Sequence, residues 1–280
     1  MIVAISGENK TGKSTFSLTF PRKLYHVELD IGGFKRAIDS PYGVKLFSGD
    51  IKAKKIVSAS YPMPQQYTMD RIMGRITLGK LKVEQPKRLT GIKELWYKLL
   101  GDLVAILETK SYTTVVIDSF PQLWELCRLA FLQEKQEIQF IPNTQQLKPG
   151  EKLRESLQPE EYVEPNARMR SLLYAFRQQG INLVIVEYMD DKYEKKLVGD
   201  KVEELITGRK MAGWNTTNIT KEVDLLLENT LVMSNHSRTE SPHYTVRTTV
   251  KLSGIGLDLM GQSFSEPSYD DIMRAKEMLT

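Results

Sequence analysis

Short apolar runs alternate along the chain with longer segments in which apolar residues recur every three or four positions. The largely apolar runs predict buried strands at residues 2–5, 113–118 and 181–188. The helical spacing predicts amphipathic helices at residues 14–20, 92–108, 122–137 and 165–179. Strands that alternate with helices in this way predict an α/β fold, in which a mostly parallel sheet is covered by helices on both faces.

Less regular segments complete what we interpret as a single domain over residues 1–280. We expect further strands at residues 24–30, 223–227 and 243–252, the last as part of a C-terminal β-arm, and a final helix that begins at Ser268. Two segments interrupt the pattern and read as insertions, at about residues 40–91 and 138–165. Residues 189–221 are charged, and we expect them to be irregular.

The first predicted strand leads directly into a GxxxxGK[ST] motif that a helix follows. Glycines let the backbone curl so that successive N–H groups point into one concavity at the helix N-terminus, whose partial positive charge favours phosphate. We therefore expect a P-loop that binds ATP through Gly7, Glu8, Asn9, Lys10, Thr11, Gly12, Lys13, Ser14 and Thr15. Lys13 is expected to reach the β- and γ-phosphates, and the Ser14 hydroxyl to bind Mg²⁺.

Three carboxylates stand at the C-terminal ends of predicted strands, the edge at which parallel α/β sheets bind ligands. Asp118 ends the buried run 113–118, so it is the candidate Walker B residue and a second Mg²⁺ ligand with Ser14. Glu28 and Asp30 lie two positions apart at the end of strand 24–30 and share one of its faces. Either of them could activate a water molecule.

In the order and spacing of these segments the chain resembles the RecA/RadA/DnaB family of RecA-like P-loop ATPases. Within that group it is most similar to the small phage-encoded nucleotide-binding proteins that include single-strand-annealing ATPases. The resemblance rests on the P-loop and on residues 26–33, 114–119, 183–188 and 222–227. It implies a RecA-like core, hydrolysis of ATP with Mg²⁺, and a homo-oligomeric ring or filament with ATP sites between subunits.

The resemblance also assigns roles to individual residues. Many P-loop enzymes carry a catalytic Glu directly after the Walker B Asp, but here that position is Ser119. Asp30 falls where the RecA-like family has its catalytic Glu, one methylene shorter, with Glu28 as the rival base. A basic residue from the neighbouring subunit would correspond best to Lys251, with Arg247 and Arg238 as alternatives. The resemblance places a γ-phosphate sensor at Glu187 or Tyr188, whereas a solvent-facing strand end explains the two equally well.

Composition limits the environment in which the protein works. With 41% hydrophobic residues the chain can bury a large core, yet no apolar run approaches the length of a membrane span. The N-terminus runs straight into a core strand without a basic segment or a cleavage site, so we expect a cytoplasmic protein, in the host cytoplasm if it is phage-encoded. Cys127 is the only cysteine, which excludes internal disulfides and cysteine-based zinc sites.

Charge is distributed unevenly and suggests a partner. The net charge is +4, but residues 45–98 hold twelve Lys and Arg against four Asp and Glu. A basic segment with interspersed Tyr61 and Tyr67 could bind phosphates and stack bases, so single-stranded DNA is the expected partner. The basic candidates are Lys52, Lys54, Lys55, Arg71, Arg75, Lys80, Lys82, Lys87 and Arg88. A solvated loop remains the simpler alternative.

These observations favour an ATPase that acts on DNA in recombination, single-strand annealing or replication. Two other functions stay open. One is a small-molecule or nucleotide kinase, because the P-loop fold alone does not choose between them. The other is a slow nucleotide switch that loads a partner protein, since Asp30 is shorter than the Glu of the family. A GTPase is disfavoured because the chain has no Asn-Lys-x-Asp motif.

Overall fold

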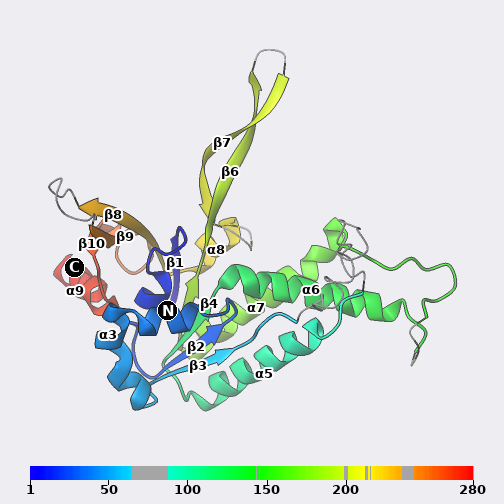
Figure 1. Cartoon of the computed structure of the whole chain (residues 1–280), viewed down its shortest axis with the longest axis horizontal. Coiled ribbons are helices and arrows are strands. Elements are labelled where there is room, and N and C mark those ends of the chain that lie inside the picture. The colour runs from blue at the N-terminus through cyan, green and yellow to red at the C-terminus, as the bar shows by residue number, and fades with distance from the viewer. Residues whose placement is uncertain are drawn as a thin grey trace, which may run out of the picture.

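An eight-stranded sheet forms the centre of the molecule (Figure 1). The computed structural model describes residues 1–64, 88–142, 144, 146–198, 201–211, 214, 216–234 and 243–279. The strand order is β10-β9-β8-β1-β5-β4-β2-β3. Their bounds are Ile2–Gly7 (β1), Leu24–Glu28 (β2), Ile56–Ser60 (β3), Thr114–Asp118 (β4), Asn182–Val186 (β5), Leu225–Ser234 (β8), His243–Ser253 (β9) and Ser263–Ser265 (β10). The strands from β8 to β3 pair parallel, and β9 and β10 extend the sheet antiparallel.

Helices cover both faces of the sheet. One face packs against α5 (Ile92–Thr109), α6 (Phe120–Ile138) and α7 (Val163–Gln179), with Trp96, Leu123 and Phe176 fully buried between the layers. The other face packs against α1 (Lys13–Ser17), α2 (Gly33–Asp39), α3 (Pro41–Lys52) and α9 (Tyr269–Leu279). Sheet residues alternate between the two cores because neighbouring side chains of a strand point to opposite faces. The mostly parallel α/β core predicted from the sequence, with helices on both faces, a C-terminal β-arm and a C-terminal helix, is confirmed.

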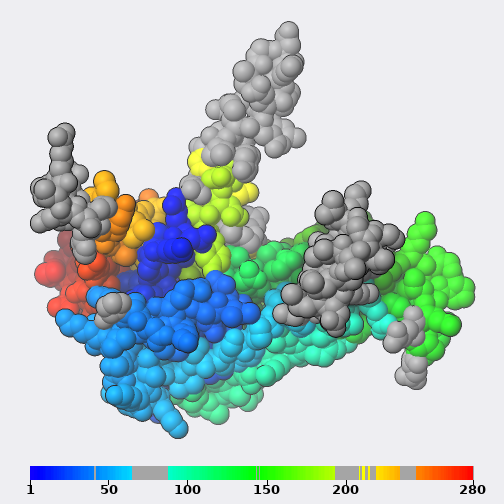
Figure 2. Space-filling view, viewed as in Figure 1, coloured from blue at the N-terminus to red at the C-terminus, as the bar shows by residue number. Residues whose placement is uncertain are grey.

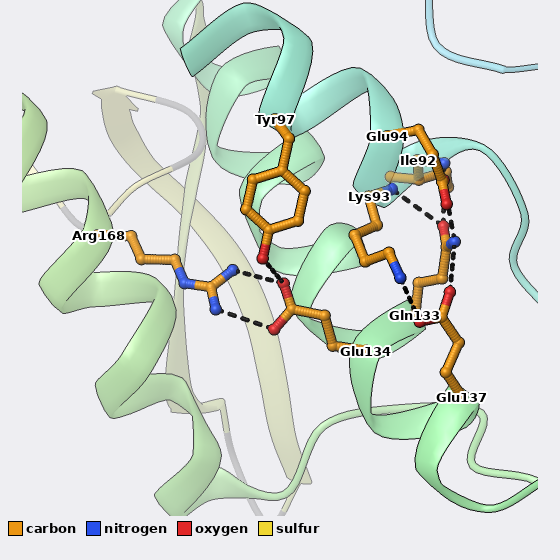
Figure 3. Close-up of polar contacts among 8 residues, drawn as sticks. All are labelled: Ile92, Lys93, Glu94, Tyr97, Gln133, Glu134, Glu137 and Arg168. Atoms are coloured by element: carbon orange, nitrogen blue, oxygen red, sulfur yellow. Dashed lines mark hydrogen bonds and ion pairs between the residues drawn. The ribbon is translucent and has the colours of Figure 1, made fainter. Parts of the chain in front are cut away.

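Polar side chains fix the helical layer formed by α5, α6 and α7 (Figure 3). The Gln133 side-chain oxygen accepts hydrogen bonds from the backbone N–H groups of Ile92 and Lys93, at 2.9 and 3.0 Å, and so satisfies two free donors at the start of α5. The two carboxylate oxygens of Glu134 accept hydrogen bonds from Nη1 and Nη2 of Arg168 on α7. These contacts join α5 and α7 to α6, which lies between them in the sequence.

Part of the segment predicted as a basic insertion belongs to the core instead. Within residues 40–91, α3 packs on the sheet through Phe47, and β3 pairs in parallel with β2 as the edge strand. Because β3 has only five residues, several of them polar, its sequence pattern alone did not predict a strand. The remainder, residues 65–87, lies outside the described residues, together with Tyr67 and the basic residues Arg71 to Lys87.

The segment predicted to be irregular forms a long antiparallel hairpin, so that prediction was wrong. Strands β6 (Met189–Val198) and β7 (Lys201–Met211) pair only with each other and stand away from the body of the protein (Figure 1), and α8 (Thr216–Glu222) follows. A two-stranded ribbon that packs against no third strand has no core to impose alternation on its sequence.

The second predicted insertion, residues 138–165, is mostly irregular. It contains an antiparallel bridge between Phe140 and Leu147 and a short 3₁₀ helix at Pro159–Tyr162. Gln139 and Gln136 bind its backbone at Lys152 and Arg154, which holds the segment to the end of α6. Among the described residues, no helix combines the length and the apolar character needed to cross a membrane.

Candidate nucleotide site

The P-loop leaves the end of β1 as a tight, curled turn. Gly7 has φ +150°, and a Cβ added there would lie 2.4 Å from the backbone oxygen of Asn229 on β8, so the close approach of the two strands requires a glycine. Gly12 has φ +73°, in the left-handed region that glycine tolerates, and the loop passes from it into α1. The Asn229 side chain donates to the Thr11 carbonyl at 3.1 Å and so holds the curl from the neighbouring strand.

The N-terminal segment lies open to the surface. Figure 2 shows it in dark blue between the orange strands β8 and β9 and the yellow-green base of β6. Glu8, Asn9 and Lys10 at the tip of the loop are exposed. The tip of the loop is therefore accessible to solvent.

Lys13 is buried at the base of the loop. Its ammonium group donates to the carbonyls of Gly7 and Glu8, at 2.9 and 2.5 Å. Burial lowers the pKa of Lys13 to about 8, and the nearby Asp118 and Glu8 carboxylates oppose that shift in part. The ammonium group thus lies inside the curl at the point where a phosphate would need a positive charge.

Ser14 and Asp118 meet across the cleft. The Ser14 hydroxyl donates to Asp118 Oδ2 at 2.5 Å, which brings two hard oxygen ligands from α1 and β4 to one point. His26, fully buried on β2, places its Nε2 atom 3.6 Å from the same carboxylate oxygen. Mg²⁺ takes few protein ligands and completes its shell with water and phosphate oxygens, so this pair fits the ion.

Of the two rival base candidates, Asp30 faces the cleft and Glu28 serves another purpose. Glu28 accepts a hydrogen bond from the backbone N–H of Phe34 at 3.0 Å and caps the start of α2. Asp30 lines the cleft, and its carboxylate accepts from the Tyr188 hydroxyl at 2.5 Å. The centre of the Tyr188 ring lies 5.1 Å from the Lys13 ammonium group, so Tyr188 contacts both Asp30 and Lys13.

One cavity of about 590 Å³ brings these groups together. Its lining joins the P-loop with the ends of β2, β4 and β5 and with α2: Asn9, Lys10, Thr11, Gly12, Lys13, Ser14, Thr15, Asp30, Gly33, Arg36, Ala37, Asp118, Val186 and Tyr188. The lining includes residues predicted from the sequence: the P-loop residues from Asn9 to Thr15, the acids Asp30 and Asp118, and Tyr188. The sequence did not predict Arg36 as a lining residue, because many surface helices carry lysine or arginine and their pattern does not show which of these residues faces a cavity.

A second cavity of about 220 Å³ adjoins the first. Gly12 and Thr15 line both cavities. Its other lining residues are apolar or aromatic at Phe16, Tyr42, Val246 and Pro267, and polar at Thr19, Ser40, Thr248 and Glu266. A flat apolar group attached to a phosphate chain could occupy this space.

Several predicted residues lie away from the cleft. Glu187 is fully buried, and Val186 and Tyr188 on either side of it line the cleft, so its side chain points to the opposite face of the sheet. Among the described residues neither of its carboxylate oxygens has a hydrogen-bond partner, and burial raises its pKa well above the ordinary value. Lys251 pairs with Glu228 of its own chain at 2.6 Å, and Arg247 is exposed on β9. Arg238 lies outside the described residues.

A P-loop at the end of the central parallel strand, with an acid at the end of β4 and one further strand between them, defines a P-loop NTPase domain. The chain belongs to the AAA_24 family, described as an AAA domain, whose model matches residues 1–254. No curated protein matches it.

The solved structures that are similar to the chain include the following two. The flagellar accessory protein FlaH from Methanocaldococcus jannaschii has 11% sequence identity and a TM-score of 0.42, over 95% of this chain and 86% of that one. A KaiC-like protein from Pyrococcus horikoshii OT3 also has 11% identity, with a TM-score of 0.43, over 95% of this chain and 89% of that one.

Proposed function

We propose that the protein binds ATP with Mg²⁺ and hydrolyses it. The observation that carries the proposal is the convergence of Lys13, Ser14 and Asp118 with Asp30 on one cavity. Lys13 would neutralise the β- and γ-phosphates, and Ser14 and Asp118 would hold the ion. Bound Mg²⁺ would supply further neutralisation of phosphate charge. Asp30 would accept a proton from the attacking water molecule, with Tyr188 orienting its carboxylate.

The two adjoining cavities suggest how the nucleotide lies. The phosphates would follow the P-loop in the larger cavity, and the base would enter the smaller one beside Tyr42 and Val246. The Tyr42 ring offers a surface on which a base can stack. Thr15 and Gly12, shared by both cavities, would lie beside the link between phosphates and base.

Nucleotide binding and turnover of Lys13→Met test the proposal. Methionine keeps the buried volume but removes the charge, so ATP affinity or turnover should fall by more than tenfold while the fold is kept. Lys45→Met, which removes one exposed lysine from α3, is the matched control and should behave like the parent. Unchanged affinity and turnover in Lys13→Met would disprove the site assignment.

The biological role that we propose for this ATPase is action on single-stranded DNA, in recombination, annealing or replication, by a homo-oligomer of the chain. The support within the described residues is an exposed basic group at the end of α3, formed by Lys52, Lys54 and Lys55. Each phosphate that a protein neutralises releases condensed counterion, so affinity for a single strand falls with a log–log salt slope of roughly −0.7 per contact.

DNA binding across a salt series tests this role. Replacement of Lys52, Lys54 and Lys55 together should flatten the slope by up to about two units and leave ATP binding almost unchanged. The comparison variant replaces Lys148 and Lys152, two exposed lysines of the segment after α6. A triple variant with the slope and affinity of the parent would remove this surface from the DNA site. Stimulation of ATP turnover by single-stranded DNA would support the role.

A further inference from the structure

We infer that Arg36 binds the terminal phosphate of the nucleotide from within the same chain and stabilises the charge that develops on it during hydrolysis. The inference rests on the proposed ATPase function and adds a catalytic residue to it. The resemblance to RecA-like ATPases implies that a basic residue of a neighbouring subunit contacts the γ-phosphate. Here we assign that role to a residue of α2 in the same chain.

The start of α2 is tied to the acidic end of the sheet. The backbone N–H of Leu29 donates to the Asp118 carbonyl at 2.7 Å, and Glu28 caps the helix through the Phe34 N–H. Gly32 at the N-cap has φ +84°, which turns the chain sharply into the helix. Arg36 lies one turn further on, and its backbone N–H bonds to the Gly32 carbonyl at 3.1 Å. These contacts hold the backbone of Arg36 close to the end of β4 that carries Asp118.

The space in front of Gly33 shows what Arg36 faces. The point where a Cβ on Gly33 would sit is 3.6 Å from Asp118 Oδ2 and 4.0 Å from Ser14 Oγ, the two candidate ion ligands. The same point is 4.0 Å from Arg36 Nη2. The guanidinium group and the ion ligands thus border one small space without touching each other. A γ-phosphate beside Ser14 and Asp118 would occupy that side of the cleft.

Arg36 is weakly engaged by its own chain. Within the described residues its side chain makes one hydrogen bond, a long one from Nη1 to the Ile31 carbonyl at 3.4 Å, and forms no ion pair. The side chain is exposed at the mouth of the cavity that it lines. A guanidinium group has five N–H donors in a planar fork that matches two phosphate oxygens, so most of its donors are available to a ligand.

The chemical step gives this charge a specific use. The water oxygen forms a bond to the γ-phosphorus, and the bond from the γ-phosphorus to the bridging oxygen breaks, with its electron pair leaving on ADP. The proton of the water passes to Asp30. Negative charge spreads over the γ-phosphoryl oxygens and the bridging oxygen as this happens, and a positioned arginine stabilises it more than it stabilises the ground state.

The test compares two nucleotides that differ only in the terminal phosphate. In Arg36→Ala, the affinity for a non-hydrolysable ATP analogue should fall at least about tenfold, the affinity for ADP should stay within about twofold, and turnover should fall about a hundredfold or more. Arg36→Lys should keep part of the triphosphate preference, because it retains charge without the fork. Lys35→Ala removes an exposed charge one position away and should match the parent.

Retained ADP binding also shows that the variant is folded. If the parent hydrolyses ATP, but Arg36→Ala loses affinity for ADP and the ATP analogue equally or loses none for either, the role of Arg36 alone would be overturned. A parent protein that binds neither nucleotide would overturn the proposed function and this inference with it. The two failures are therefore distinct.

Discussion

Replacement of Glu187 by Gln should make the protein's stability less dependent on pH. Glu187 is a fully buried carboxyl group whose oxygens have no hydrogen-bond partner among the described residues, and desolvation raises its pKa well above the ordinary value of 4.5. The folded protein therefore keeps this group protonated and neutral at pH values where the unfolded chain ionises it. Glutamine has nearly the same shape and carries no proton that titrates.

The size and sign of the effect follow from proton linkage. Between the ordinary and the raised pKa, the folded state binds one more proton at this position than the unfolded state does. The contribution of Glu187 to the free energy of unfolding is thus fully present below pH 4.5 and falls by about 1.4 kcal/mol per pH unit above it, until the folded-state pKa is passed. Glu187→Gln lacks this loss, so its stability relative to the parent should rise with pH by the same amount.

Urea denaturation followed by tryptophan fluorescence, repeated from pH 5 to pH 8.5, measures the difference directly. The buried Trp96 and Trp214 report on unfolding. Glu108→Gln, at an exposed position on α5, is the matched control and should follow the parent. A stability difference that stays constant with pH would refute the reasoning. Turnover of Glu187→Gln should equal that of the parent, because the side chain points away from the cleft.

Three further predictions concern the cleft. Asp30→Asn should reduce turnover at least tenfold with little change in ATP affinity. Glu28→Gln should reduce turnover less, and it should lower the free energy of unfolding by about 1 kcal/mol because it weakens the cap on α2. Steady-state kinetics and denaturation of both variants measure these effects, and a larger loss of turnover in Glu28→Gln would reassign the base. Asp118→Asn should raise the Mg²⁺ concentration needed for half-maximal turnover, and a titration that matches the parent would contradict its role as an ion ligand. Tyr42→Ala should weaken ATP binding but not binding of inorganic tripolyphosphate, as measured by calorimetry; equal effects on both would remove Tyr42 from the base pocket.

Much of the fold was encoded in local patterns. The apolar runs at β1, β4 and β5 and the helical spacing over α5, α6 and α7 were read correctly, because burial between two helical layers imposes its period on the sequence. The P-loop and Asp118 were also identified in this way, since a phosphate-binding turn needs glycines and a lysine in fixed order. The structure places Ser14 Oγ 2.5 Å from Asp118 Oδ2, although 104 positions separate the two residues along the chain.

Other features had no local signal. The β6–β7 hairpin packs against no third strand, so no apolar face marked its strands, and β3 is a short edge strand whose place depends on β2.

The sequence by itself determined the P-loop, the acidic strand ends and the alternation that builds a parallel sheet. Only the tertiary structure placed Asp30 rather than Glu28 at the cleft, turned Glu187 away from it, held Lys251 against Glu228, and brought Arg36 to the lining of the cavity. The physical reason is that a strand end or a helix turn offers several polar side chains with the same local pattern. Which of them faces a ligand depends on the backbone donors, neighbouring strands and charges that the rest of the chain places beside them.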